Sequence, residues 1–144
     1  MHYYPTIQRT EDGFVATFKD IPEAITQGDN KRELMEQSYD ALLTALEFYF
    51  EDLRKVPEPT PLNDPHAQYV FYVKLPLSVE LRVIFLNEYV AQLERDPGFT
   101  LFNNRADIQS LNSLLDLQQP LDITFYERAI HALDRSFDIH VRVK

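Results

Sequence analysis

Three carboxylates, Asp20, Glu23 and Asp29, lie in and around the motif DIPEAITQGDN, which follows a short apolar run that begins at Gly13. Carboxylates gathered at the ends of strands can hold two divalent ions about 4 Å apart and activate water for phosphodiester hydrolysis. They can also form the acidic part of a surface that binds a basic partner. The neighbouring residues distinguish these two possibilities.

The residues around these carboxylates favour the binding surface. A sheet-based two-metal nuclease needs an acid inside its first strand, and the run HYYPTIQR has none. Asp20 precedes a proline-bearing turn, and Asp12 lies in a predicted hairpin turn, where aspartate bonds nearby backbone. Asp29 precedes a predicted helix, where a negative charge suits the helix dipole. The sequence therefore predicts no catalytic metal site. The alternative is a chain that keeps a residual metal-dependent nuclease activity.

The other reactive side chains match no known catalytic motif. The chain has no cysteine, which excludes thiolate chemistry and disulfides. It has three glycines, too few for a phosphate-binding loop, and neither the H-E-x-x-H nor the G-x-S-x-G pattern. We therefore predict no enzymatic activity and no cofactor.

Charge and composition favour a soluble protein with a basic partner. Net charge is −9 over 144 residues, of which residues 1–62 contribute −6 (6 basic, 12 acidic) and residues 63–144 contribute −3 (8 basic, 11 acidic). This balance is opposite to that of a nonspecific nucleic-acid binder. The N-terminus MHYYPTIQRT lacks the pattern of a signal peptide, and no apolar run is long enough for a membrane span. We expect a cytoplasmic protein.

The first half of the chain reads as short strands followed by a long helix. Strands are predicted over 3–10, 14–19 and 24–27, with Gly13 supplying the left-handed backbone of a three-residue hairpin. Asn30 is the predicted N-cap of a helix, with Glu33 completing a capping box. Apolar residues at spacings of three and four are expected to face the sheet: Leu34, Met35, Tyr39, Leu42, Ala45, Leu46, Tyr49, Phe50 and Leu53.

The second half is mainly helical. A proline-rich connector, KVPEPTPLNDP, precedes the strand AQYVFYVKLP (67–76). Helices are predicted over 78–96 with Ser78 as N-cap, over 105–117 and over 122–135. The last residues, FDIHVRVK, alternate as a strand that needs a sheet edge, either in this chain or in a second copy. Its apolar face carries Phe137, Ile139, Val141 and Val143.

These elements predict an α+β fold: a β-β-β-α-β module followed by a helical module that ends in a short strand. Residues 1–62 form the first module, 63–75 a strand that completes its sheet, and 76–144 the second module. The successive helices are compatible with a helix-turn-helix bundle. Its reading helix would expose Asn104, Arg105, Gln109 and Asn112, and bury Ile108, Leu111, Leu114 and Leu115.

The stretch GFVATFKDIPEAITQGDNKRELMEQSYDALLTALEFYFED, with PEPTPL and VKLPLSVELRVIFLNEYV after it, resembles the HicB antitoxins of bacterial HicA–HicB toxin–antitoxin pairs. The resemblance implies that the first module is a partial ribonuclease-H-like fold without a working active site. It further implies that this module covers the catalytic histidine of a small basic HicA toxin, which cleaves mRNA. Family C-terminal modules bind operator DNA through helix-turn-helix or ribbon-helix-helix domains. Here, ERDPGFTLFNN replaces the expected second helix and turn, and the predicted reading helix carries one basic residue, Arg105.

The leading hypothesis is therefore an antitoxin that occludes the active site of a HicA-type toxin, represses its own operon through operator DNA and forms a homodimer or a higher oligomer. A repressor without a toxin partner is the second alternative, beside the nuclease. The expected dimer contact is the terminal strand. The expected toxin contacts are positions in or beside the matching motif: Asp20, Glu23, Asp29, Glu36, Asp40, Glu47 and Phe50.

Overall fold

The computed structural model describes residues 1–62 and 71–143. Four short strands begin the fold: β1 (His2–Tyr3), β2 (Thr6–Thr10), β3 (Gly13–Thr17) and β4 (Ile25–Gly28). The single strand predicted over 3–10 is divided in two around Pro5, which has no backbone N–H to donate to a ladder. The other two predicted strands are confirmed, with their ends displaced by one or two residues.

β2 and β3 form an antiparallel hairpin in which Thr10 lies opposite Gly13, so its turn is one residue shorter than predicted. Gly13 has φ of +154°, and a Cβ added there would lie 2.4 Å from the carbonyl oxygen of Gly28 in the neighbouring strand β4. Glycine is thus required at this position both by the backbone conformation and by the close approach of β4.

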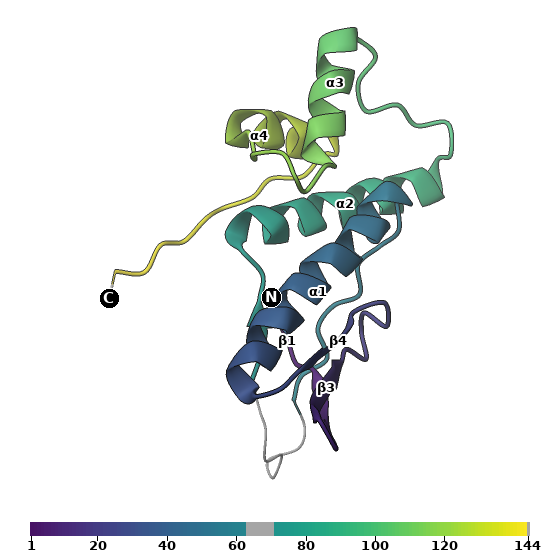
Figure 1. Ribbon diagram of the computed structural model, residues 1–144. Helices are drawn as coiled ribbons and strands as arrows, with labels where there is room; N and C mark the ends of the chain where they lie inside the picture. The colour runs from purple at the N-terminus through teal and green to yellow at the C-terminus, as the bar shows by residue number, and fades with distance from the viewer. Residues whose placement is uncertain (63–70, 144) are drawn as a thin grey trace.

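The strands form two small sheets, with orders β2-β3-β4 and β1-β5. β5 (Val73–Lys74) pairs antiparallel with β1, with His2 opposite Lys74, and the Leu75 N–H donates to the Met1 carbonyl at 3.1 Å. Residues 67–70 of the predicted strand 67–76 lie outside the described residues. The β-β-β-α-β order is confirmed once β1 and β2 are taken as one interrupted strand (Figure 1).

α1 (Lys31–Glu51) packs against β3 and β4. The predicted N-cap is confirmed, since Asn30 Oδ1 accepts the Glu33 N–H at 2.9 Å. The Glu33 carboxylate reaches back to the N–H of Asp29 at 3.1 Å, one residue before the cap. Buried residues of the predicted stripe are Leu34, Leu42, Ala45, Leu46, Tyr49 and Phe50.

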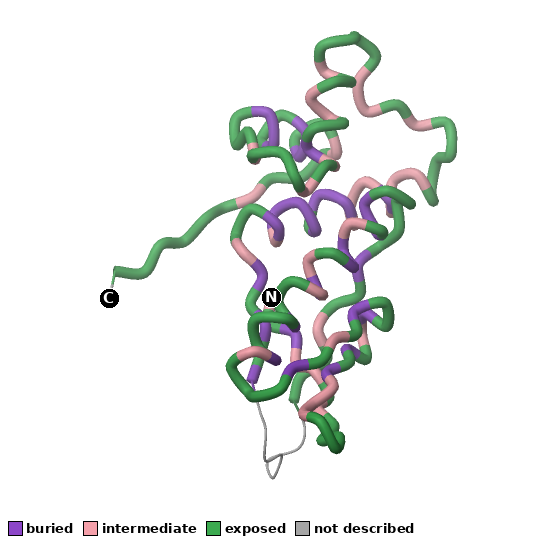
Figure 2. The backbone as a smooth tube through the Cα atoms, viewed as in Figure 1, coloured by how far each residue is buried: buried purple, intermediate pink, exposed green. Residues whose placement is uncertain are grey.

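α2 (Leu77–Arg95) lies between two hydrophobic cores (Figures 1 and 2). Val79, Val83 and Leu86 join the core beneath α1 and the strands, whereas Leu81 and Phe85 join a second core formed with α3 and α4. The predicted cap is wrong: Pro76 precedes the first turn, and no side chain caps it. Pro76 has φ −56° and ψ 148°, and it has no backbone N–H that would be left unpaired at the helix start.

α3 (Arg105–Leu114) and α4 (Ile123–Ala132) begin at side-chain caps, Asn104 and Asp122. The buried Arg82 of α2 holds the connection between them, donating through Nη1 to the Asp116 carbonyl at 2.8 Å and through Nη2 to the Gln119 carbonyl at 2.7 Å. Burial lowers the pKa of Arg82, and the Asp116 carboxylate opposes this shift.

The predicted terminal strand does not form among the described residues. Residues 136–143 adopt no regular structure, and the end of this segment extends away from the helices (Figure 1). A strand is defined by ladder hydrogen bonds, and none joins this segment to the described part of the chain. The terminal segment was expected to pair with a sheet edge of this chain or of a second copy. The first of these is excluded for the edges formed by the described residues. No helix among these residues is both long and apolar enough to cross a membrane.

Candidate protein-binding surface

Asp20 is engaged in holding the chain that follows α1. Its carboxylate accepts the Thr60 N–H at 2.8 Å through Oδ2 and the Thr60 hydroxyl at 2.5 Å through Oδ1. These bonds join the turn after β3 to the connector, 40 residues later in the chain. Asp20 therefore has a structural role that sequence spacing could not reveal.

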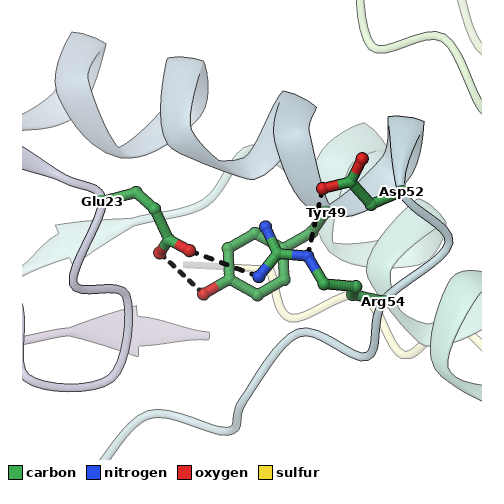
Figure 3. Close-up of polar contacts among 4 residues, drawn as sticks. All are labelled: Glu23, Tyr49, Asp52 and Arg54. Atoms are coloured by element: carbon green, nitrogen blue, oxygen red, sulfur yellow. Dashed lines mark hydrogen bonds and ion pairs between the residues drawn. The ribbon is translucent and has the colours of Figure 1, made fainter.

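Glu23 belongs to a polar cluster at the C-terminal end of α1 (Figure 3). The Tyr49 hydroxyl donates to Glu23 Oε2 at 2.8 Å, and Arg54 Nη1 lies 3.3 Å from Oε1. Arg54 Nε also contacts Asp52 at 3.3 Å, and its guanidinium carbon lies 4.1 Å from the centroid of the Tyr49 ring. The cluster joins the turn before β4 to the end of α1.

The cluster holds Glu23 in its charged form. Burial acts to raise the pKa of Glu23, but the hydrogen bonds from its own backbone, Tyr49 and Arg54 outweigh it, so the pKa is lowered. Burial, with the bond to Glu23, raises the pKa of Tyr49 to about 12. The phenol is thus a hydrogen-bond donor at neutral pH, which suits a structural anchor.

The three carboxylates of the opening motif do not converge. Asp20 binds the connector, Glu23 binds the end of α1, and Asp29 is exposed beside the start of α1, at the opposite end of a 21-residue helix. Among residues 1–62 and 71–143, no group of three or more potential ligands is placed to hold a metal ion.

The remaining predicted contacts on α1 divide into exposed, occupied and buried. Glu36 and Asp40 are exposed, one turn apart, and Glu36 pairs with Arg32 at 3.4 Å. Glu47 accepts a hydrogen bond from Gln118 and so faces the connection between α3 and α4. Phe50 was expected both in the buried stripe and as a toxin contact. It is 3% exposed in the core beneath α1, so the first expectation is confirmed and the second is wrong.

A groove between α1 and β5 combines acidic and apolar side chains. Its volume is about 530 Å³. Met35, Tyr39 and Tyr72 are 41%, 37% and 52% exposed there. We name as the α1–β5 surface the groove residues whose side chains lie toward solvent: Met35, Glu36, Tyr39, Asp40, Tyr72 and Lys74.

Aromatic side chains extend this surface onto β1. The ring centroids of His2 and Tyr72 are 4.5 Å apart, and those of Tyr4 and Tyr72 are 6.1 Å apart. Tyrosine and methionine are enriched at protein–protein interfaces. Tyrosine also buries a large area at a small cost in side-chain entropy, because its side chain has only two χ angles. This composition is typical of a protein-binding surface.

Sequence reasoning missed the apolar part of this surface. Met35 and Tyr39 were assigned to the buried stripe, because helical periodicity does not show how wide a stripe the sheet covers. Tyr72 alternates with the buried Phe71 and Val73, so its exposure could have been inferred from the strand period.

The predicted reading helix exposes most of its polar residues. Arg105, Gln109 and Asn112 are exposed and spaced as one helix face. Asn104 instead caps α3, accepting the Asp107 N–H at 2.8 Å. Leu114 is buried as predicted, and Leu111 and Leu115 are half-buried, but Ile108 is 41% exposed because α3 is covered along a narrow strip only.

Known proteins that resemble this chain identify its family. Residues 3–84 match the model of a family described as the HicB_like antitoxin of a bacterial toxin–antitoxin system. This chain belongs to the HicB-like antitoxin family. The matched residues include β2, β3, β4, α1, β5 and the start of α2, and therefore the whole α1–β5 surface.

Similar proteins carry the same family name. Antitoxin HicB 1 of Photorhabdus laumondii is 45% identical over 91 residues, 62% of this chain and 55% of that protein. Antitoxin HicB of Escherichia coli K12 is 46% identical over 80 residues, 56% of this chain and 55% of that protein. These two matches span about half the length of the relatives. Antitoxin HicB 2 of P. laumondii is 30% identical over 145 residues, 96% of this chain and 95% of that protein.

Proposed function

We propose that this chain neutralises a small, basic, RNA-cleaving toxin of the HicA type by covering its reactive centre with the α1–β5 surface. Membership of an antitoxin family supports the class of partner. The observation that carries the location is the exposed group of Met35, Tyr39 and Tyr72 beside Glu36 and Asp40. This group lies within the part of the chain that the family model matches.

Charge and apolar contact have different roles in this proposal. The acidic first module, net −6 over residues 1–62, attracts a basic toxin and accelerates encounter. Rim carboxylates such as Glu36 and Asp40 add little affinity, because water screens them. Affinity therefore depends on burying Tyr39, Tyr72 and Met35. Neutralisation by occlusion needs no chemistry from the chain itself.

The test compares two aromatic residues of the α1–β5 surface with a third aromatic residue that lies on α1 but outside this surface. Tyr39→Ala together with Tyr72→Ala removes two anchors of roughly 1.5 kcal/mol each, so the Kd for the toxin should rise about 100-fold. Phe48, 50% exposed on α1 but outside the groove, is the control, and Phe48→Ala should leave Kd unchanged. Calorimetry with a small basic protein encoded beside this chain measures both. Equal affinity of the double variant and the wild type would place the contact elsewhere.

Operator binding is a second proposed activity, supported by one face of α3. Arg105, Gln109 and Asn112 lie exposed on that face, and their side chains can contact phosphate or base edges. Arg105→Ala should weaken binding to a fragment of the chain's own promoter, and the salt dependence of binding should fall by about one ion. Promoter binding that does not change with Arg105→Ala would remove α3 from this role.

A further inference from the structure

The C-terminal segment leaves apolar side chains uncovered. Ile139, Val141 and Val143 are 47%, 82% and 96% exposed. Phe137, on the same alternating face, is half-buried against the second core, with its ring 5.1 Å from that of Tyr126. The segment is thus half-buried at Phe137 and exposed from there to its end (Figure 2).

Two contacts fix where this segment leaves the body. Arg135 Nε lies 2.9 Å from Glu88 Oε2 of α2, and its backbone N–H donates to the Ile130 carbonyl at 3.1 Å. On the face of α2 that carries Glu88, Leu77 and Ile84 are 57% and 41% exposed. An apolar surface therefore lies beside the point from which the segment departs.

We propose that two copies of this chain pair through residues 137–143 as antiparallel strands about a two-fold axis at His140. In this register Phe137 lies opposite Val143, and Ile139 opposite Val141, so each apolar residue meets an apolar residue of the other copy. On the other face, Asp138 of each copy lies opposite Arg142 of the other. A two-fold interface must be self-complementary in this way.

Neighbouring registers pair fewer residues of this segment with one another. An axis at Val141 pairs only residues 139–143 of the segment and places His140 opposite Arg142. An axis at Ile139 places Val143 opposite Arg135. Opposite charges and apolar pairs directly across an antiparallel ladder each stabilise it by roughly 0.2–1 kcal/mol, and mismatched pairs do not. A two-stranded ribbon alone is only marginally stable, so Phe137 and the exposed face of α2 supply the support.

Disulfide trapping tests this register, because the chain has no cysteine of its own. Residues opposite each other in an antiparallel pair have Cα atoms roughly 4.5–5.5 Å apart, within the range that a disulfide spans. His140→Cys should therefore cross-link two copies nearly completely under mild oxidation at micromolar concentration. Ser136→Cys, four residues away in an exposed position, is the matched control. Its two copies would lie roughly 26 Å apart, at about 3.3 Å per residue, and should not cross-link.

Charge exchange gives a second, independent measurement. Asp138→Arg and Arg142→Asp should each raise the dimer dissociation constant about tenfold in analytical ultracentrifugation, and the double exchange should restore it. Residues 138 and 142 are both exposed, so none of the three variants should disturb the fold of a single chain. A dimer in which His140→Cys fails to cross-link, a full chain that stays monomeric, or a double exchange without recovery would each overturn the proposal.

Discussion

The Glu23 carboxylate is anchored by a phenol and a guanidinium, and its role is structural. Tyr49 and Arg54 both come from the end of α1 or just after it, whereas Glu23 precedes β4. Each bond crosses from one element to another. No local pattern marks such a cluster, which explains why the sequence could identify the motif around Glu23 but not the partners of this residue.

Replacing Glu23 should have a pH-dependent effect on stability. The pKa of Glu23 is lowered in the folded chain, because the hydrogen bonds from its backbone, Tyr49 and Arg54 outweigh the opposing effect of burial. The contribution is therefore complete above the ordinary value of 4.5 and is lost as pH falls through the lower, folded value. Glu23→Gln should lower the free energy of unfolding by about 0.5–1 kcal/mol at pH 7. The effect is small because water screens the partly exposed contacts of Glu23.

Denaturant unfolding of both proteins at pH 7 and near pH 3 measures this effect. The difference between wild type and Glu23→Gln should shrink toward the acid end, as the wild-type carboxyl takes up a proton. A difference that stays constant over this range would show that the charge of Glu23 is not what stabilises the turn.

Among the elements, α1 was predicted most completely. Its N-cap depends on Asn30 and Glu33, three residues apart, and such short-range signals survive folding unchanged. The width of its buried stripe depends on what the sheet covers, which is tertiary information. Met35 and Tyr39 were therefore wrongly placed in the stripe, and Phe50, which was correctly placed there, was wrongly expected as a toxin contact as well. The terminal strand shows the same limit, because alternation predicts an apolar face but supplies no edge.

Gly28 controls how closely α1 approaches β4. A Cβ added at Gly28 would lie 2.6 Å from the backbone nitrogen of Leu34 and 2.8 Å from its Cα, so the helix would have to move. Gly28→Ala should therefore destabilise the fold by roughly 1–3 kcal/mol. Gly98→Ala is the matched control, since its nearest neighbour would be the Asp96 side chain at 3.6 Å. Thermal unfolding of the two variants compares them, and equal melting temperatures would contradict this reading of the α1–β4 contact.

At the scale of the whole molecule, α2 joins two cores through opposite faces. Its residues Val83 and Leu86 pack beneath α1, and Leu81 and Phe85 pack against α4. Sequence periodicity predicted α2 as a helix but not this double role, because both faces of a shared helix are apolar. The buried Arg82 adds two hydrogen bonds that fix the α3–α4 connection to the same helix.

The acidic charge of the molecule and its exposed aromatic group both fit a basic protein partner. The acidic charge could be predicted from composition. The class of partner could be predicted from the resemblance of residues 13–52 to an antitoxin family. The surface itself required the fold, because it combines α1 with β5, which lie 22 residues apart along the chain (Glu51 to Val73).

Cleavage of RNA by the purified toxin, with and without an equal amount of this chain, tests the central claim most directly. We expect cleavage to stop at a one-to-one ratio with the wild-type chain and to persist with the Tyr39→Ala, Tyr72→Ala variant. Undiminished cleavage in the presence of excess wild-type chain, or Mg²⁺-dependent cleavage by this chain alone, would contradict neutralisation by occlusion.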